Sequence, residues 1–223
     1  LKVILNLLEL QREGQFETLC HFSSSEVYGS AQTARMDENH PRNPTTTYAA
    51  GKAAADLALT SYVAMFGLDA FILRPFNNFG PRQNYKGKLA AIIPLTVCKI
   101  LDGISPEIHG TGEQMRDFIF VKDTIRSTLQ LYQIMPAGED VNIATDNSIT
   151  MNYLMAKIIE IMAYKGGVKK CPERGSDVIR HTGCNRKMMD FLNFKPTDFD
   201  EALLITINWY NAEIAKIVRA NDS

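Results

Sequence analysis

The sequence predicts an α/β protein in which helices flank a parallel β-sheet. Short apolar runs alternate along the chain with longer segments whose apolar residues recur at helical spacing. This alternation is typical of strand–helix–strand units, whose strands lie parallel. The composition fits a folded protein with a substantial core, because 45% of the 223 residues are hydrophobic and 22% are charged.

The first part of the chain supplies two strands and two helices. Residues 2–13 carry apolar side chains at near-helical spacing, which predicts a helix. The run TLCHFS (18–23) predicts a buried strand, and residues 30–43 form a polar loop. Ala, Leu and Met dominate residues 48–66, which predicts a helix that Gly67 ends. The run LDAFIL (68–73) predicts the next strand.

The same pattern continues to the end of the chain, with no internal repeat and no low-complexity linker. The expected elements are a loop at 74–83, a helix at 89–101, a strand at 115–121, a helix at 124–135 capped by Asp123, a strand at 141–144, a helix capped by Ser148 or Thr150 that ends near Tyr164, a short helix near Lys187, and a final helix at 200–217.

Charge and cysteine content exclude several classes of protein. Lys and Arg total 24 and Asp and Glu total 25, so the net charge of −1 gives no basic surface for nucleic acid or an anionic membrane. The four cysteines form no CxxC pair, and the four histidines fit no metal-ligand spacing. No apolar run reaches the roughly 18 residues that span a bilayer, and no signal peptide is visible. We therefore expect a cytoplasmic protein with reduced thiols and no metal.

The strongest chemical signal is a tyrosine and a lysine four residues apart, Tyr48 and Lys52. On a helix this spacing places both side chains on one face. An ammonium group beside a phenol stabilises the phenolate and lowers the tyrosine pKa from about 10, as a general base requires. The pair alone is also compatible with an ordinary surface contact.

A serine-rich segment gives this pair its context. FSSSEVYG (22–29) follows the first predicted strand, and ligands of parallel α/β sheets bind beyond the carboxyl ends of the strands. A serine there could hydrogen-bond a substrate hydroxyl, and Glu26 could act as a second base. The alternative is that the serines cap a turn and Glu26 is solvated.

With these segments, the chain resembles the extended short-chain dehydrogenases/reductases that modify nucleotide sugars. The matching segments are SSSEVYG (23–29), YAAGK (48–52), RPFNNFGPRQ (74–83), GTGEQMRDFIFVKD (110–123) and ERGSDVIRH (173–181). The resemblance runs over most of the chain and implies NAD as cofactor and a nucleotide-diphosphate sugar as substrate.

The resemblance also implies an architecture: part of a Rossmann-type doubly wound parallel sheet, namely its C-terminal half, with a small α/β substrate-binding domain. Residues 1–80 would carry the catalytic part of the NAD-binding domain. Residues 81–223 would mainly bind the nucleotide sugar, while about 115–145 return to the Rossmann core. A homodimer that pairs through the helices at 2–13 and 48–66 is implied for the full-length protein.

By this resemblance, Tyr48 is the catalytic base and Lys52 holds the nicotinamide ribose and depresses the tyrosine pKa. Ser24 helps to activate the sugar C4 hydroxyl. Arg116 grips the diphosphate, for which a guanidinium fork is well suited, although a surface ion pair with Asp117 or Glu113 is the alternative. The other implied site residues are Ser25 and Glu26 for catalysis, Ser23, Pro75 and Asn77 toward the cofactor, and Asn78, Lys88, Leu89, Asn142 and Arg174 toward the substrate.

Glu26 favours one branch of this family. A glutamate here is typical of 4,6-dehydratases and decarboxylases, since a carboxylate can remove the C5 proton once C4 is a ketone. Ser25 stands where dTDP-glucose dehydratases carry an aspartate, which leaves the nucleotide and the reaction open. We expect a 4,6-dehydratase; a UDP-glucuronate-type decarboxylase, a 4-epimerase and a non-enzymatic NAD-binding regulatory module are the alternatives.

The glycine-rich turn that holds the cofactor pyrophosphate in this family has no counterpart here. None of the 14 glycines has the required spacing. The chain therefore resembles the family without roughly its first third, the initial βαβ units. We expect exposed strand edges and apolar faces, and an isolated 223-residue chain that binds NAD weakly, is inactive and aggregates.

Overall fold

A parallel sheet forms one end of the molecule. The computed structural model describes residues 1–87, 90–173 and 178–221. Strands β1 (Thr18–Phe22), β2 (Asp69–Pro75) and β6 (Asp140–Ile143) pair in the order β1-β2-β6, and both pairings are parallel. These three strands follow the apolar runs of the sequence, which confirms the predicted α/β class.

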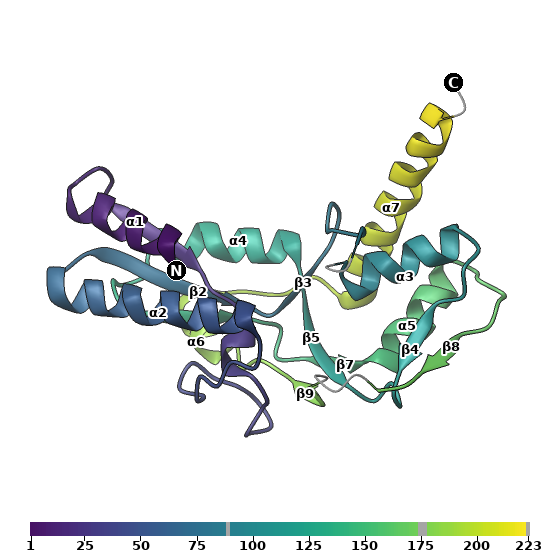
Figure 1. Cartoon of the computed structure of the whole chain (residues 1–223), viewed down its shortest axis with the longest axis horizontal. Coiled ribbons are helices and arrows are strands. Elements are labelled where there is room, and N and C mark those ends of the chain that lie inside the picture. Colours follow the sequence, from purple (N-terminus) through teal and green to yellow (C-terminus); the bar gives the residue numbers. More distant parts are fainter. Residues whose placement is uncertain (88–89, 174–177, 222–223) are drawn as a thin grey trace.

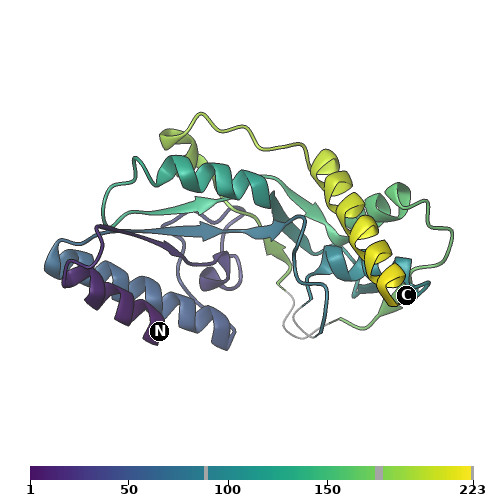
Figure 2. The same cartoon turned by 90° about the horizontal axis from the view of Figure 1, so that it is seen from above.

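Helices cover both faces of this sheet (Figure 2). Helices α1 (Lys2–Arg12) and α2 (Thr47–Phe66) lie on one face, and α4 (Val121–Leu131) and α6 (Arg186–Phe191) lie on the other. Side chains of β2 alternate between the two layers, as the pleat of a strand requires. Ala70 and Ile72 pack against α1 and α2, whereas Phe71 and Leu73 pack against α4 and α6.

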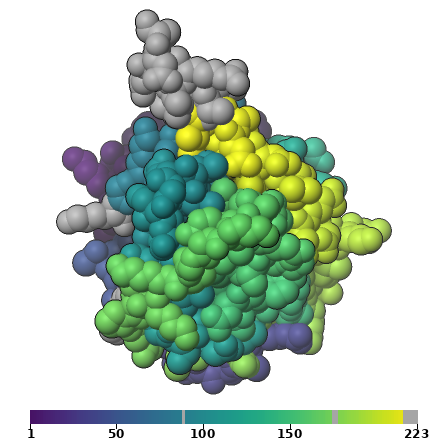
Figure 3. Space-filling view, turned by 90° about the vertical axis from the view of Figure 1, so that its right-hand side faces the viewer, coloured from purple at the N-terminus to yellow at the C-terminus, as the bar shows by residue number. Residues whose placement is uncertain are grey.

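A second assembly forms the other end of the molecule (Figure 1). Its sheet has the order β3-β5-β7, with β9 also paired to β5, and a separate two-stranded sheet joins β4 and β8. Figure 3 looks onto this end, where teal, green and yellow parts of the chain lie side by side. The elements are β3 (Asn77–Phe79), α3 (Ile92–Leu101), β4 (Glu107–His109), β5 (Met115–Phe120), β7 (Ser148–Thr150), α5 (Met151–Ile161), β8 (Lys169–Cys171), β9 (Arg180–His181) and α7 (Phe199–Asn221).

Strand β5 connects the two cores. Phe118 and Phe120 point into the core under α3, α5 and α7, whereas Ile119 between them packs with the parallel sheet. Strand β3 pairs parallel with β5 and follows β2 after a single residue, Phe76. Both assemblies therefore share continuous backbone, which fixes their relative position.

The helix caps show one correct prediction and one error. The Thr150 hydroxyl accepts a hydrogen bond from the Tyr153 amide at 3.1 Å and starts α5, as predicted. Asp123 does not cap α4, which begins two residues earlier at Val121. Its carboxylate is buried and accepts hydrogen bonds from the amide and hydroxyl of Thr197.

The end of β1 and helix α4 carry exposed apolar side chains. The edge of β1 away from β2 pairs with no strand in the described part of the chain. Phe22 at its end is 43% exposed, and Ile125 and Leu129 of α4 are more than half exposed. The described part of the chain thus has an unpaired strand edge and exposed apolar side chains, while aggregation and weak NAD binding of the isolated chain stay predictions. None of the four cysteines forms a disulfide, and none of the described helices is long and apolar enough to cross a membrane.

Candidate active site

The serine-rich segment forms a short 3₁₀ turn, η1 (Ser25–Tyr28), directly beyond the carboxyl end of β1. The Ser24 hydroxyl accepts a hydrogen bond from the Glu26 amide at 3.3 Å, so it caps this turn. That hydroxyl keeps its own proton available for donation to a ligand. Ser24 and Glu26 are both half-buried, so both side chains have exposed surface at this loop.

The tyrosine–lysine pair lies next to the same loop, at the start of α2. The Thr46 hydroxyl caps the helix by accepting from the Ala49 amide at 3.1 Å. Lys52 Nζ donates to the carbonyl oxygen of Phe22 at 2.6 Å and lies 5.9 Å from the centre of the Tyr48 ring. Tyr48 is 57% exposed. The predicted pair therefore shares a helix face and is tied to the end of β1.

A fully buried arginine joins the elements that carry this site. Arg74 Nε and Nη2 both lie 2.9 Å from Asp56 Oδ2 on α2, and Nη1 lies 2.5 Å from Asp140 Oδ2 on β6. Arg74 Nη1 also lies 3.3 Å from the hydroxyl of Tyr28 in η1. Burial lowers the pKa of Arg74, but the surrounding oxygens outweigh it and raise the pKa overall. The result is one ionic network that connects α2, η1, β2 and β6.

Asp56 stays ionised in this network. Burial would raise the pKa of its carboxyl, but the His21 ring, the Arg74 charge and the Ser23 hydroxyl together lower it below its usual value. Asp56 follows Lys52 by one helical turn, so it lies on the same side of α2 as the tyrosine–lysine pair. The network therefore anchors the helix beneath the predicted general base.

Three predicted site residues lie in the interior. Ser23 and Ser25 are buried, with Ser23 directed toward Asp56. Asn142 is fully buried; its amide oxygen accepts from the Tyr28 hydroxyl at 2.8 Å, and its amide nitrogen donates to the Met36 carbonyl at 3.1 Å. All three side chains are buried in the described structure, and their contacts with cofactor or substrate stay predictions.

A cavity of about 200 Å³ opens between β5 and helices α3 and α5. Arg116 and Asn77 line it, together with Glu107 and His109 of β4. Arg116 Nη1 donates a hydrogen bond to the carbonyl oxygen of Met115 at 2.9 Å, and this contact helps to orient the guanidinium. The cavity thus combines the guanidinium of Arg116, the side-chain amide of Asn77 and apolar side chains of α5. This combination suits a polar ligand that carries an anionic group.

Adjacent asparagines of β3 face opposite sides. Asn77 lines the Arg116 cavity, and its amide donates to the Asp117 carbonyl at 3.0 Å. Asn78 instead lines an apolar groove with Phe22 and Pro75, and its amide oxygen accepts from the Thr124 hydroxyl at 2.5 Å. Asn77 therefore shares a cavity with Arg116, and Asn78 shares a groove with Pro75, while the predicted contacts of both residues stay predictions.

Two buried ionisable groups hold the second sheet in place. Asp117 accepts hydrogen bonds from the Thr145 hydroxyl and the amides of Thr145, Asp146 and Gly183. Burial nevertheless raises the pKa of its carboxyl to about 6. His181 stacks on Phe76 at 5.2 Å between ring centres, and burial, with the nearby Arg116 charge, lowers its pKa to about 4.

Lys88, Leu89 and Arg174 lie outside the described residues. Sequence reasoning missed Asp56 and Arg74, although both interrupt apolar context. Asp56 is an acid in a helix rich in alanine and leucine, and Arg74 follows the apolar run of β2 directly. A charge in such a run signals a buried, paired group. Glu107 and His109 had no signal, since only the tertiary fold brings β4 to the cavity.

Comparison with known proteins places the chain. Residues 1–144 match the profile of the "NAD dependent epimerase/dehydratase family". The chain belongs to this family. It is 32% identical over 194 residues to dTDP-glucose 4,6-dehydratase of Actinoplanes sp., an alignment that covers 86% of this chain and 59% of that relative. The chain thus spans less than two thirds of that family member.

Solved structures of the family agree with the fold. UDP-N-acetylglucosamine 4-epimerase from Methanobrevibacter ruminantium, in complex with UDP-N-acetylmuramic acid, has a TM-score of 0.90 and 33% identity, covering 96% of this chain and 69% of that one. dTDP-glucose 4,6-dehydratase from Bacillus anthracis, in complex with NAD, has a TM-score of 0.86 and 28% identity, covering 94% and 66%. The parallel sheet is therefore part of the Rossmann-type fold.

Proposed function

We propose that the protein is an NAD-dependent 4,6-dehydratase of a nucleotide-diphosphate sugar. The observation that supports this most directly is that η1, which carries Glu26 and is capped by Ser24, contacts α2, whose Lys52 lies near the Tyr48 ring and donates to the Phe22 carbonyl at the end of β1. Both relatives and structural neighbours of this family include enzymes named as dehydratases.

The residues at this end of the sheet fit a nicotinamide cofactor. Phe22 and Pro75 line an apolar groove beside Lys52, which suits an aromatic ring with a cationic group near its ribose. When bound, NAD accepts a hydride from the sugar C4 and later returns it. Lys52 would exchange its contact with the Phe22 carbonyl for the ribose hydroxyls.

The chain's own residues would perform the proton transfers. Tyr48 removes the proton of the C4 hydroxyl while Ser24 holds the same oxygen by hydrogen bonding. The Lys52 ammonium stabilises the phenolate form of Tyr48, which is the base that accepts this proton and becomes a neutral phenol. With C4 as a ketone, Glu26 would remove the C5 proton. The C6 hydroxyl would take up a proton from solvent and depart as water, which leaves a C5–C6 double bond. Return of the stored hydride to C6 and of the proton held by Glu26 to C5 would give the 4-keto-6-deoxy sugar.

Arg116 and Asn77 would bind the diphosphate of the substrate. A guanidinium donates parallel hydrogen bonds to phosphate oxygens, and Asn77 lies in the same cavity. Lys88, Leu89 and Arg174 remain predictions from the resemblance alone. Val3, Leu57 and Met65 of α1 and α2 are all more than 60% exposed. That exposed apolar surface supports a homodimer through these helices as part of the proposal.

One specific observation favours a second candidate, a 4-epimerase. The structural neighbour with 33% identity and a TM-score of 0.90 is a 4-epimerase. An epimerase needs only C4 oxidation, rotation of the keto sugar and return of the hydride to C4. Glu26 would then have no chemical task, which is the point at which the two candidates differ.

The decisive experiment is Glu26→Gln in the protein expressed from its complete gene. With dTDP- or UDP-glucose, mass spectrometry should show loss of water in the parent enzyme. Glu26→Gln should lose at least 100-fold of that rate while reduced cofactor still appears. Glu13→Gln, an exposed glutamate on α1's C-terminal side, is the matched control and should keep parent activity. Full dehydration by Glu26→Gln would reject the role, and an epimer of unchanged mass would favour the 4-epimerase.

A further inference from the structure

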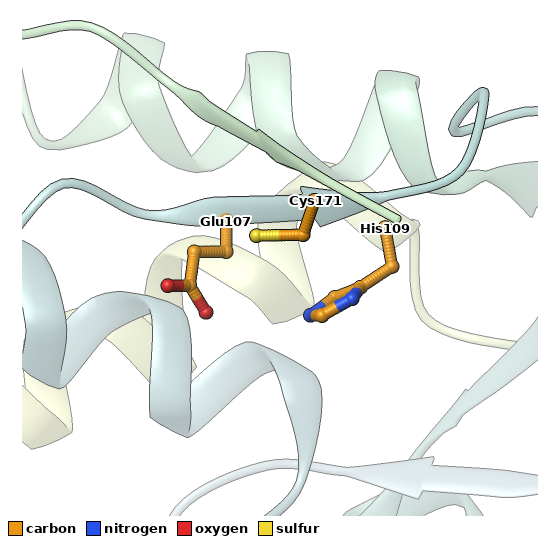
Figure 4. A group of neighbouring side chains, drawn as sticks. All are labelled: Glu107, His109 and Cys171. Carbon is orange, nitrogen blue, oxygen red and sulfur yellow. The ribbon is translucent and has the colours of Figure 1, made fainter. Parts of the chain in front are cut away.

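Three potential metal ligands converge on the small sheet of β4 and β8, away from the serine loop. The two strands run parallel, with Glu107 opposite Lys169 and His109 opposite Cys171. Glu107 and His109 are two residues apart and therefore share one face of β4. A carboxylate oxygen, an imidazole nitrogen and the Cys171 sulfur all lie within 4.8 Å of one another. Figure 4 shows the three side chains on the same side of the strands.

We propose that Glu107, His109 and Cys171 bind a divalent transition-metal ion of the Zn²⁺ class. Thiolate, imidazole and carboxylate are the ligand types that this ion prefers, and hard ions such as Mg²⁺ avoid sulfur. Three protein ligands leave a fourth tetrahedral position for water or another ligand. Binding releases the thiol proton to solvent, so the site gains an anionic sulfur as it takes up the cation.

The local geometry needs only small side-chain movements. Metal–ligand bonds of about 2.0–2.3 Å place tetrahedral ligand atoms roughly 3.3–3.8 Å apart. Donor atoms within 4.8 Å must therefore approach by about 1 Å, which side-chain rotation on a fixed two-stranded sheet can supply. His109 Nδ1 lies 3.2 Å from the Pro172 carbonyl oxygen, a contact that orients the ring as in many metal sites.

Two lysines set the charge of the site. Lys99 and Lys169 lie 2.7 and 3.1 Å from the two Glu107 oxygens. Their hydrogen bonds, first Lys99 and then Lys169, lower the pKa of Glu107 to about 2, so the carboxylate is ionised wherever the metal competes. Each oxygen keeps a second lone pair for the ion. Both ammonium groups also repel a cation, and Lys169 is 64% exposed and able to move into solvent.

Because the lysine charges repel a cation, a metal site here predicts an effect that would not be expected if the three side chains bound no metal. Removing the Lys169 charge should tighten metal binding, by roughly threefold or more at low salt. Removing a ligand should weaken it by at least about tenfold. Glu107 and His109 also line the Arg116 cavity, so a bound ion would lie in the wall of that cavity.

The test is titration of the metal-free full-length protein with Co²⁺, followed by displacement with Zn²⁺. We expect a thiolate-to-cobalt absorption band with visible bands of tetrahedral intensity, lost in Cys171→Ser and in His109→Gln. Cys184→Ser removes a half-buried cysteine elsewhere and should leave the bands unchanged. Circular dichroism of each apo variant shows whether it is folded.

Lys169→Gln should move the titration to lower metal concentration. Absence of a cysteine-dependent band, equal behaviour of the Cys171 and Cys184 variants, or weaker binding by Lys169→Gln would each overturn the proposal. The readout needs no catalytic activity, so it stands or fails independently of the proposed dehydratase.

Discussion

Replacing Arg74 with methionine should cost the fold more than any other single loss of charge in the parallel sheet. The guanidinium is fully buried between Asp56, also fully buried, and Asp140. Methionine keeps much of the side-chain length but leaves the Asp56 carboxylate without its main counter-charge. The remaining neighbours of Asp56 are the Ser23 hydroxyl and His21, whose Nε2 lies 3.5 Å from Asp56 Oδ1.

The loss in free energy of unfolding depends on which charges stay buried after the substitution. Breaking a buried ion pair by removing one partner costs about 3–5 kcal/mol, because the other charge stays buried. Arg42 provides a matched control, since it reaches the same Asp140 oxygen at 3.0 Å from a more exposed position. An ion pair near the surface contributes about 0–1 kcal/mol. Arg74→Met should therefore lose several times as much free energy of unfolding as Arg42→Met.

Urea unfolding at pH 7, followed by circular dichroism, measures both variants. The double variant Asp56→Leu/Arg74→Leu should be more stable than Arg74→Met, because it removes the stranded carboxylate as well. The deficit of Arg74→Met should also shrink as the pH falls, since Asp56 can then become neutral. If Arg74→Met and Arg42→Met agreed within 1 kcal/mol, the network would not hold these elements together.

Three further predictions concern pH and ligand binding. Burial lowers the pKa of His181 to about 4 from an ordinary 6.5, so the unfolded chain binds a proton first as the pH falls. The free energy of unfolding should therefore drop between about pH 6.5 and 4, by up to roughly 3 kcal/mol. In His181→Gln, the melting temperature should change less over that pH range than in the parent chain. Burial raises the pKa of Asp117 to about 6 from an ordinary 3.8, so the folded chain holds this proton more tightly and the stability it contributes is lost as the pH rises from about 4 to 6. The melting temperature of Asp117→Asn should not fall over that pH range as that of the parent chain does. An unchanged dependence of melting temperature on pH would refute the raised pKa of Asp117. The isolated chain should show little or no NAD-dependent thermal shift, whereas a clear shift with turnover would contradict the expectation that the pyrophosphate site is absent.

The long elements could be predicted from the sequence because their signals are local. Within the run 68–73, residues 70–73 are all apolar, as in strands buried on both faces, and they lie in β2. Helix α2 combines strong helix formers with a threonine cap and Gly67 in the left-handed conformation. The short strands β3, β4 and β8 have three residues each, too few to show a period. Their structure comes from pairing with distant segments.

The site residues likewise fall into those that local sequence predicts and those that depend on tertiary structure. The spacing of Tyr48 and Lys52 is a helical property and needs no tertiary information. Which of two neighbouring residues faces a ligand depends on register, and register is set by the pairing partner. Thus Asn77 and Asn78 could be placed in the loop after β2, but their faces follow only from the pairing of β3 with β5. Asn142 likewise shows its buried role only once Tyr28 lies beside it.

The distance between the proposed proton transfers and the proposed diphosphate contact is set by very short stretches of backbone. Pro75 ends β2 beside the groove with Phe22, and Asn77 begins β3 at the Arg116 cavity, with only the buried Phe76 between them. The ring of Phe76 packs against His181, whose strand pairs with β5 and so with Arg116 itself. For a substrate that spans the two regions, the distance between its two sets of contacts is therefore set by the packed interior and not by loops. For this reason cavity-forming changes at Phe76 should impair catalysis from a position that touches neither the reacting sugar nor the diphosphate.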